Sequence, residues 1–338
     1  MAQGTRMAAE IREAPAVVAR QAAALAGPVA ELAARLKARP PAVVVTCARG
    51  SSAHAATYGK HLIERALGIP VAAAAPAIAT VYGRRLNLAG QLFLTVSQSG
   101  RSDDLIEQAA FAKAGGALTV ALVNAVDSPL AAACDVVLPL EAGPELSVAA
   151  TKTFIASATA LLQLVAGWSE ETALREAGAR LPERLDRALA LDWSAALPAL
   201  VDATSLVTTG RGPTLAIARE AALKLKETCN LHAEAFSGAE FMHGPVTLVG
   251  EDFPILMFTP TDAGADGMRR LAASLREKGA ELFAAEPGGG LPALEPDQAD
   301  ADAICLVQSF YGLAVELAAR RGIDVDQPRH LQKVTRTR

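Results

Sequence analysis

Residues 92–102 read LFLTVSQSGRS, and this stretch decides the fold. Its first half, 92–96, is an apolar run of the kind found in parallel strands that are buried on both faces. Its second half is rich in serine and glycine, and a helical pattern follows over residues 102–114. A buried strand, a polar turn and a helix in this order predict one unit of a parallel α/β sheet.

Strand-like and helix-like runs alternate on both sides of this unit. The first half predicts strands at 42–47, 71–75, 92–96, 118–123 and 135–138, and helices at 52–67, 102–114 and 147–166. The second half predicts strands at 206–209, 254–258 and 281–284, and helices at 214–229, 267–278 and 303–320. The pattern predicts an α/β fold of two similar domains, each a flavodoxin-like, doubly wound parallel sheet flanked by helices. The predicted divisions are a helical segment (1–40), a first domain (41–168), a helical linker (169–195), a second domain (196–323) and a tail (324–338).

A weak internal repeat supports two similar domains. Residues 45–52 (VTCARGSS) align with 207–214 (VTTGRGPT), and strand 92–96 aligns with 254–258, because 207 − 45 and 254 − 92 both equal 162. The copies differ after this strand, where the first has the serine-rich turn and the second has Pro260 and Asp262. Proline lacks an N–H group and aspartate repels an anion, so we expect an anion site in the first copy only.

Composition restricts the functions that we consider. The 338 residues include 51% hydrophobic and 20% charged residues with a formal net charge of −4, which argues against nucleic-acid or membrane-surface binding. The four cysteines form no CxxC motif and predict free thiols in a reducing cytoplasm. The first residues show no signal peptide, and the apolar stretch 155–168 is too short to span a membrane.

Three further groups of polar residues are candidates for chemistry. Glu220, Lys224 and Glu227 share one helical face, which predicts either a solvated ion-pair stripe or a proton-transfer carboxylate tuned by a lysine. His243 belongs to a His-Gly-Pro turn, which predicts an imidazole presented to a ligand or a structural histidine, and no metal-ligand spacing is present. By composition alone, Lys333 in the tail is a solvated lysine.

Five ordered motifs together resemble a known family. They are SQSG at 97–100, VAATK at 148–152, EAALKLKE at 220–227, EFMHGP at 240–245 and DVDQP at 324–328. From about residue 43 to residue 333, the chain resembles double sugar-isomerase (SIS) proteins: the isomerase part of glutamine–fructose-6-phosphate amidotransferase and the stand-alone SIS-type glucosamine-6-phosphate deaminases.

The resemblance implies a role for each matching residue. The phosphosugar is expected at Ser97, Gln98, Ser99, Ser102, Gly50, Ser52, Val148 and Thr151. Glu227 is expected to move a proton between carbons 1 and 2, with Lys224 assisting at the neighbouring oxygen or nitrogen. His243 is expected to open the sugar ring from the partner subunit of a homodimer, and Lys333 to close over the site. Ala150 and His330 depart from the family pattern, which leaves the sugar open.

The resemblance implies an amino-sugar phosphate deaminase that converts glucosamine 6-phosphate to fructose 6-phosphate and ammonia. No metal or organic cofactor is expected. The first cysteine, Cys47, falls within a predicted strand, so we expect no glutaminase nucleophile. The alternatives are a fructosamine-6-phosphate deglycase, a simple phosphosugar isomerase, and a non-catalytic phosphosugar sensor.

Overall fold

The computed structural model describes residues 4–333, so residues 1–3 and 334–338 of the two predicted end segments lie outside the described residues. The chain forms two compact units. Among the described residues, one unit consists of 16–145, 152–179 and 332–333, and we call it the amino unit. The other consists of residues 4–15, 146–151 and 180–331, and we call it the carboxy unit.

The amino unit contains a five-stranded parallel sheet. Its strands are β1 (Val44–Cys47), β2 (Val71–Ala73), β3 (Leu92–Ser97), β4 (Leu118–Val123) and β5 (Val136–Pro139). Their order is β2-β1-β3-β4-β5, and every neighbouring pair is parallel. This is the flavodoxin-like order, in which the direction of winding reverses between β1 and β3.

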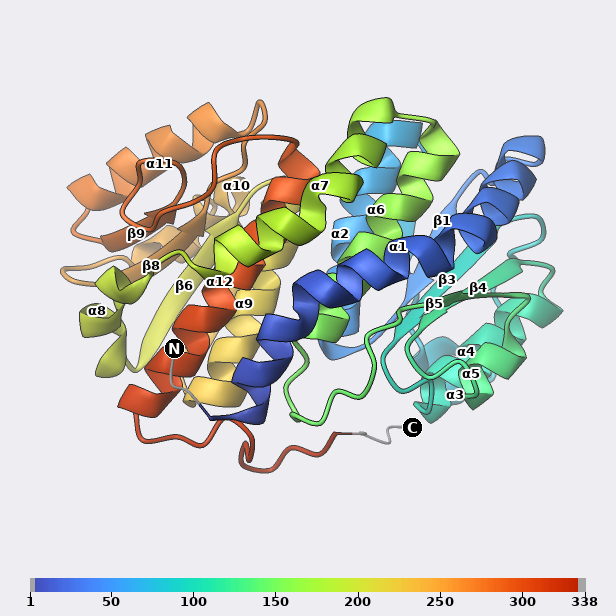
Figure 1. Ribbon diagram of the computed structural model, residues 1–338, viewed down its shortest axis with the longest axis horizontal. Coiled ribbons are helices and arrows are strands. Elements are labelled where there is room, and N and C mark those ends of the chain that lie inside the picture. The colour runs from blue at the N-terminus through green and yellow to red at the C-terminus, as the bar shows by residue number, and fades with distance from the viewer. Residues whose placement is uncertain (1–3, 334–338) are drawn as a thin grey trace. The chain divides into compact units, whose positions relative to one another are not determined.

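Helices cover both faces of this sheet (Figure 1). On one face lie α2 (Gly50–Leu67) and the largely buried α6 (Lys152–Ser169), which pack against each other. On the other face lie α4 (Asp103–Ala114) and α5 (Pro129–Ala133), with the short α3 (Ala77–Thr80) beside α4. Phe93, Leu105 and Leu130 belong to the apolar core beneath α4 and α5, so burial of these chains holds the helices on the sheet.

The carboxy unit contains a four-stranded parallel sheet in the order β7-β6-β8-β9. Its strands are β6 (Ser205–Gly210), β7 (His232–Ser237), β8 (Pro254–Phe258) and β9 (Glu281–Ala285). The sequence did not predict β7, because this edge strand alternates exposed polar residues with buried ones. The fold class predicted from the sequence, two doubly wound parallel sheets flanked by helices, is confirmed.

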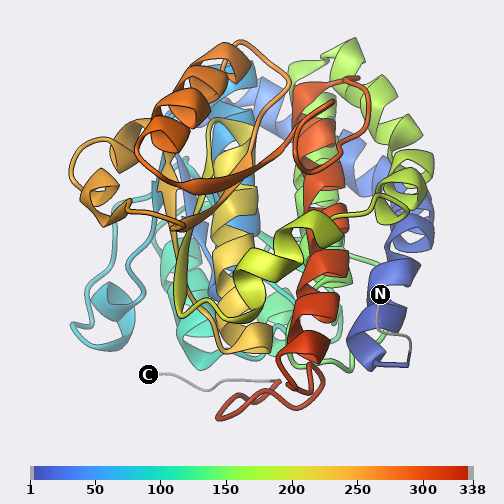
Figure 2. The same cartoon turned by 90° about the vertical axis from the view of Figure 1, so that its left-hand side faces the viewer.

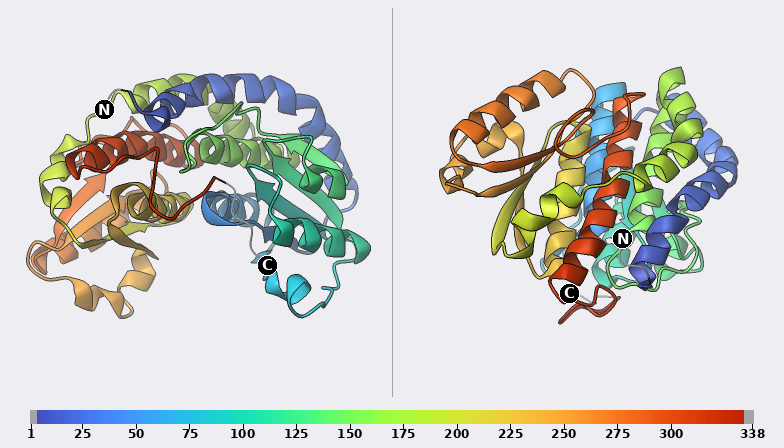
Figure 3. Two further views of the ribbon diagram at one scale, coloured as in Figure 1. Left: turned by 90° about the horizontal axis from the view of Figure 1, so that it is seen from below. Right: turned by 60° about the vertical axis from the view of Figure 1, so that its left-hand side comes forward.

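Two long helices, α9 (Pro213–Cys229) and α12 (Ala299–Arg320), lie side by side on one face of the second sheet (Figure 2). The other face is covered by α10 (Gly238–Phe241) and α11 (Ala265–Glu277), through a core that includes Phe241, Ile255 and Met268 (Figure 3). The short α8 (Leu197–Val201) packs on α12. By length and composition α12 could cross a membrane, but most of its residues are buried, as expected for a core helix.

Two further helices contribute residues to both units. They are α1 (Arg6–Ala38), with residues up to Pro15 in the carboxy unit, and α7 (Thr172–Leu189), with residues from Arg180 onward in the carboxy unit. The helix predicted to begin at residue 147 begins at Lys152 instead, because residues 146–151 form an irregular segment that groups with the carboxy unit.

The strand registers confirm the internal repeat. Val44 pairs with Val71 in the first sheet, and Leu206 and Ala233, each 162 positions later, pair in the second. In the same way, Val45 pairs with Phe93 and Val207 pairs with Ile255. The offset changes by one residue at the fourth strand, because Leu92 pairs with Leu118 whereas Pro254 pairs with Glu281. Three strands of each sheet therefore share one register, and the second sheet has no named strand equivalent to β5.

Candidate functional site

The carboxyl edge of β1 and β3 brings together the residues predicted to bind phosphate. The helix that follows β1 begins at Gly50 and includes Ser52, and the helix that follows β3 begins directly after Ser102. Since β1 and β3 are neighbours at the point where the winding reverses, both helix N-termini lie at the same edge of the sheet. Helix N-termini favour anions through their N–H groups and the helix dipole.

The turn after β3 is organised by its own hydroxyl groups. Ser97 accepts a hydrogen bond of 3.0 Å from the N–H of Gly100, and Ser99 accepts one of 3.3 Å from the N–H of Arg101. Each hydroxyl therefore keeps its hydrogen for donation to a ligand. Ser102 occupies the N-cap position of α4 but makes no side-chain cap bond, so ordinary capping does not account for this serine.

Gly100 is required at this turn for two reasons. Its φ of +62° lies in the left-handed region, which disfavours residues with a Cβ. A Cβ there would also lie 2.1 Å from the hydroxyl oxygen of Ser128, the buried N-cap residue of α5. The sequence analysis did not identify Ser128, because its approach to Gly100 depends on the packing of β3 beside β4.

An ion pair joins the two helix starts at this edge, and the sequence analysis missed it. Arg49 precedes α2, and its guanidinium lies 2.8–2.9 Å from the carboxylate of Asp104 in the first turn of α4. The Asp104 side chain is only 2% exposed, whereas that of Arg49 is 55% exposed. The pair fixes α2 and α4 relative to each other and leaves part of a cation facing solvent beside the serine turn.

The equivalent edge of the second sheet is occupied by its own side chains. The Thr214 hydroxyl accepts a hydrogen bond from the Arg211 N–H and donates toward the carbonyl of Phe258, at 3.0 and 2.6 Å. Asp262 accepts a bond of 2.8 Å from the N–H of Gly264, where an anion would otherwise interact. Pro213 opens α9 without an N–H group. These contacts support the expectation that this edge is unsuited to an anion.

The acid–base candidates on α9 are buried rather than solvated. The side chains of Glu220 and Lys224 are fully buried, and that of Glu227 is 20% exposed. The Lys224 Nζ lies 3.6 Å from Glu220 Oε1 and pairs directly with Glu227 Oε2. The alternative of a solvated ion-pair stripe is therefore wrong. Buried charges are costly unless they are paired, so this cluster needs a reason other than solubility.

Val148 and Thr151 lie on the irregular segment before α6, which groups with the carboxy unit. Val148 is half-buried and Thr151 is fully buried. Glu10 of α1 orders this segment by accepting hydrogen bonds from the N–H groups of Leu146 and Ser147. The two predicted sugar contacts therefore rest on a defined segment.

Lys333 is not simply a solvated lysine. Its Nζ lies 3.1 Å from Oε2 of Glu145 within the amino unit, and the Glu145 side chain is fully buried. Glu145 also accepts bonds from the backbone and side chain of Thr153 at the start of α6. In the carboxy unit, Asp326 of the tail accepts bonds of 2.7 and 3.0 Å from the first N–H groups of α1. Asp326 and Lys333 of the tail are thus each held by residues distant in the sequence.

His243 lies on an exposed turn between α10 and a 3₁₀ helix (Pro245–Leu248). Its backbone N–H donates a bond of 2.9 Å to Glu240, and the apolar side chains of Met242 and Leu248 nearby are also exposed. The exposed position of His243 suits an imidazole that is presented to a ligand. His232 is an exposed residue at the start of β7.

The four cysteines are free and buried. Burial raises the pKa of the Cys47 and Cys305 thiols to about 12 and that of the Cys134 and Cys229 thiols to about 11. A cysteine nucleophile needs a thiolate at working pH, so none of these thiols is suited to that role. Within residues 4–333, no group of three or more metal-binding side chains is present.

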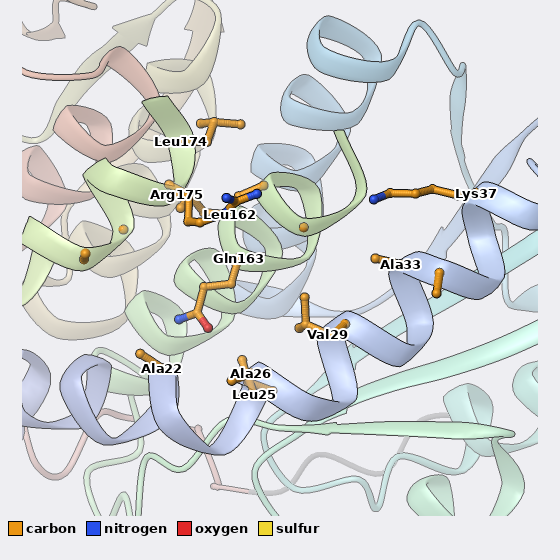
Figure 4. Close-up of a pocket in the computed structure, with 16 residues that line it drawn as sticks. Ala22, Leu25, Ala26, Val29, Ala33, Lys37, Leu162, Gln163, Leu174 and Arg175 are labelled. Atoms are coloured by element: carbon orange, nitrogen blue, oxygen red, sulfur yellow. The ribbon is translucent and has the colours of Figure 1, made fainter. Parts of the chain in front are cut away.

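The amino unit also has an apolar groove of about 640 Å³ between α1, α6 and α7 (Figure 4). Leu25, Val29, Leu162 and Leu174 are among the apolar residues that line it, with many alanines. Lys37, at one end, is paired with Glu170 at 2.7 Å. The lining includes none of the predicted site residues, so the groove is separate from the proposed chemistry.

The chain contains two doubly wound domains in which three strands share one register. One domain has helix N-termini suited to an anion, and the other has a buried Glu–Lys–Glu cluster. These features define a class of duplicated α/β proteins suited to small phosphorylated ligands. Comparison with known proteins gives the family: the chain belongs to the SIS domain family, whose model matches residues 41–167 and 199–284.

Three similar proteins illustrate the relationship. A Pseudomonas aeruginosa glutamine–fructose-6-phosphate aminotransferase (isomerizing) is 34% identical over 97% of this chain and 58% of its own length. A provisionally named phosphosugar isomerase of Silicibacter pomeroyi DSS-3 is 45% identical, with a TM-score of 0.91 over 96% of this chain and all of its own. The C-terminal domain of a Francisella tularensis glucosamine-fructose-6-phosphate aminotransferase is 26% identical, with a TM-score of 0.83 over 97% of this chain and 99% of its own. The chain spans only about half the length of most of the curated relatives it matches.

Proposed function

We propose that this chain is a phosphosugar isomerase that acts on an amino-sugar 6-phosphate and releases ammonia. The observation that supports this most strongly is the buried cluster of Glu220, Lys224 and Glu227, in which only Glu227 is partly exposed. A phosphosugar sensor needs the serine turn but has no use for a buried ammonium between two carboxylates, which is costly to maintain.

The proposed reaction requires one base and no oxidant. With the sugar ring open, Glu227 removes the proton from carbon 2 of glucosamine 6-phosphate and returns a proton to carbon 1. The amino nitrogen loses a proton and the carbon 1 oxygen gains one, so the double bond moves from carbon 1–oxygen to carbon 2–nitrogen. Water then adds to the imine at carbon 2, and ammonia leaves, which gives fructose 6-phosphate. General acid–base help of this kind typically contributes about 10²–10⁴ in rate.

Other residues have supporting roles in this proposal. Ser97, Ser99 and Ser102 would donate hydrogen bonds to the phosphate, and the exposed part of Arg49 would add positive charge beside it. Lys224 would stabilise negative charge that develops at the neighbouring oxygen or nitrogen. Lys333 would act from the tail on the keto sugar.

We further propose a cytoplasmic homodimer in which His243 of one subunit opens the sugar ring at the site of the other. The exposed turn that presents His243 beside Met242 and Leu248 supports this, because apolar side chains exposed together suit an interface. Mixing inactive His243→Ala and Glu227→Gln chains should restore activity through hybrid sites. Absence of restoration despite subunit exchange would contradict the shared site.

The decisive experiment incubates the purified chain with glucosamine 6-phosphate and measures ammonia and fructose 6-phosphate. Equimolar release of both supports the deaminase. Turnover of fructosamine 6-phosphates instead would favour a deglycase, and interconversion of unaminated sugar phosphates without ammonia would favour a simple isomerase. Tight binding without turnover, and without proton exchange at carbon 2 in deuterated water, would favour the sensor.

A further inference from the structure

The acid–base cluster of the carboxy unit extends beyond α9. Tyr311 belongs to α12, and its hydroxyl lies 3.2 Å from Oε1 of Glu220, which is 91 residues away in the sequence. Both side chains are fully buried. Figure 2 shows that α9 and α12 run side by side, which brings the two residues together.

This hydroxyl acts on the oxygen of Glu220 that faces the lysine. Glu220 Oε1 accepts from Tyr311 and lies 3.6 Å from the Nζ of Lys224, whereas Lys224 is in closer contact with Glu227. A hydroxyl donor shares the charge of the carboxylate oxygen that it contacts, so Glu220 has less negative charge to offer the ammonium. The ammonium therefore lies toward Glu227, the partly exposed member of the cluster.

We propose that Tyr311 is a positioning residue for the proton transfer: it holds Glu220 so that the Lys224 ammonium is directed to Glu227. This inference rests on the proposed function, because it gives Glu227 the role of base. Tyr311 is fully buried and contacts Glu220, so in this proposal it acts on Glu227 through Glu220 and Lys224.

The alternative is that Tyr311 only fills space. Its ring lies 6.1 Å from that of Phe310, and a buried tyrosine contributes substantial apolar area whatever its hydroxyl does. Tyr311→Phe separates the two ideas because it removes the hydroxyl and keeps the ring. Tyr58→Phe is the matched control, since Tyr58 is equally buried but belongs to α2 of the amino unit.

The test measures kcat and KM for the phosphosugar that the wild-type chain turns over. We expect Tyr311→Phe to lower kcat about tenfold with KM changed less than about twofold, and Tyr58→Phe to leave kcat unchanged. Tyr311→Gln, which keeps a donor, should recover part of the loss and provides a second variant should the phenylalanine variant fold poorly. A thermal melt of each variant shows whether the chain is folded.

A double-mutant cycle shows whether Tyr311 acts through Glu220. If it does, Tyr311→Phe combined with Glu220→Gln should be no slower than Glu220→Gln alone, because the hydroxyl no longer has a charged partner to position. Folded Tyr311→Phe with wild-type kcat, or losses that multiply in the double variant, would overturn the inference alone. A folded wild-type chain that turns over no phosphosugar would overturn the proposed function and the inference with it.

Discussion

The two sheets share the order and register of three strands, but their carboxyl edges differ in what satisfies the polar groups. In the amino unit, the turn after β3 consists of serine and glycine, and its N-cap residue Ser102 makes no side-chain cap bond. In the carboxy unit, Thr214 and Asp262 bond to the backbone groups of the corresponding turns. The Ser97 and Ser99 hydroxyls of one copy accept from the backbone and keep their hydrogens for a ligand, whereas the Thr214 hydroxyl of the other copy donates to its own backbone.

The difference teaches how a duplicated fold can divide its functions. The first unit has small hydroxyl residues and two positive-φ glycines, Gly50 and Gly100, at its edge. The second unit has instead buried a Glu–Lys–Glu cluster along α9, at a cost that its own ion pairs offset. An anion site and an acid–base site are thus built on the same scaffold at different places.

The largest expected effect concerns the buried cluster. Glu227→Gln keeps the shape of the side chain but removes the base, so kcat should fall by about 10²–10⁴. Phosphosugar binding measured by calorimetry should change little, because the serine turn is untouched. Glu234→Gln, on an exposed position of β7, is the control and should keep full activity. Near-normal turnover by Glu227→Gln would place the base elsewhere.

The second prediction concerns a negative charge placed at the carboxyl edge of the amino unit, like that of Asp262 in the carboxy unit. Ser99→Asp introduces a carboxylate into the serine turn and should weaken phosphosugar binding by about 10² or more, because like charges repel at close range. Ser99→Asn, which is neutral and of the same size as aspartate, should weaken binding far less. Asp262→Asn in the carboxy unit should leave the dissociation constant unchanged. Equal losses at both edges would contradict the division of roles.

A smaller effect is expected from Gly100→Ala, which tests how closely the serine turn is packed. The left-handed φ should cost about 1–2 kcal/mol and the clash with Ser128 about 1–3 kcal/mol more, and binding should weaken about tenfold. Gly68→Ala has a similar φ of +67° and no neighbour within 4 Å, so only the first cost applies. Urea denaturation of both variants measures the difference in their free energies of unfolding. Equal destabilisation would show that the Ser128 side chain moves aside without cost.

The last prediction concerns the four cysteines, for which we expect no glutaminase activity. Because burial raises the pKa of every thiol in the chain to about 11 or 12, the purified chain should not hydrolyse glutamine at pH 7.5. Adding glutamine should leave the rate of ammonia release unchanged. Glutamate production by the chain alone would refute this prediction.

The sequence predicted the parts of the molecule that depend on local pattern. The strand at 92–96, which extends to Ser97 in the structure, and its serine turn were evident because a buried parallel strand is apolar throughout and its ligand turn is not. β7 was missed because an edge strand with exposed His232 and Glu234 resembles a polar loop. The pattern on α9 left open whether Glu220 and Lys224 face water, since the answer depends on Tyr311, 91 residues away. Pairs such as Lys333 and Glu145, 188 residues apart, form only when the chain folds.

The buried thiols have a practical consequence for observing motion. Cys47 and Cys134 belong to the amino unit, and Cys229 and Cys305 to the carboxy unit. A buried thiol reacts with an alkylating reagent only during a transient opening, so its labelling rate reports the local opening equilibrium. Mass spectrometry of the labelled peptides would therefore follow each unit separately in one sample. A phosphosugar held at the β1/β3 edge should slow the labelling of Cys47, which ends β1, more than that of Cys305.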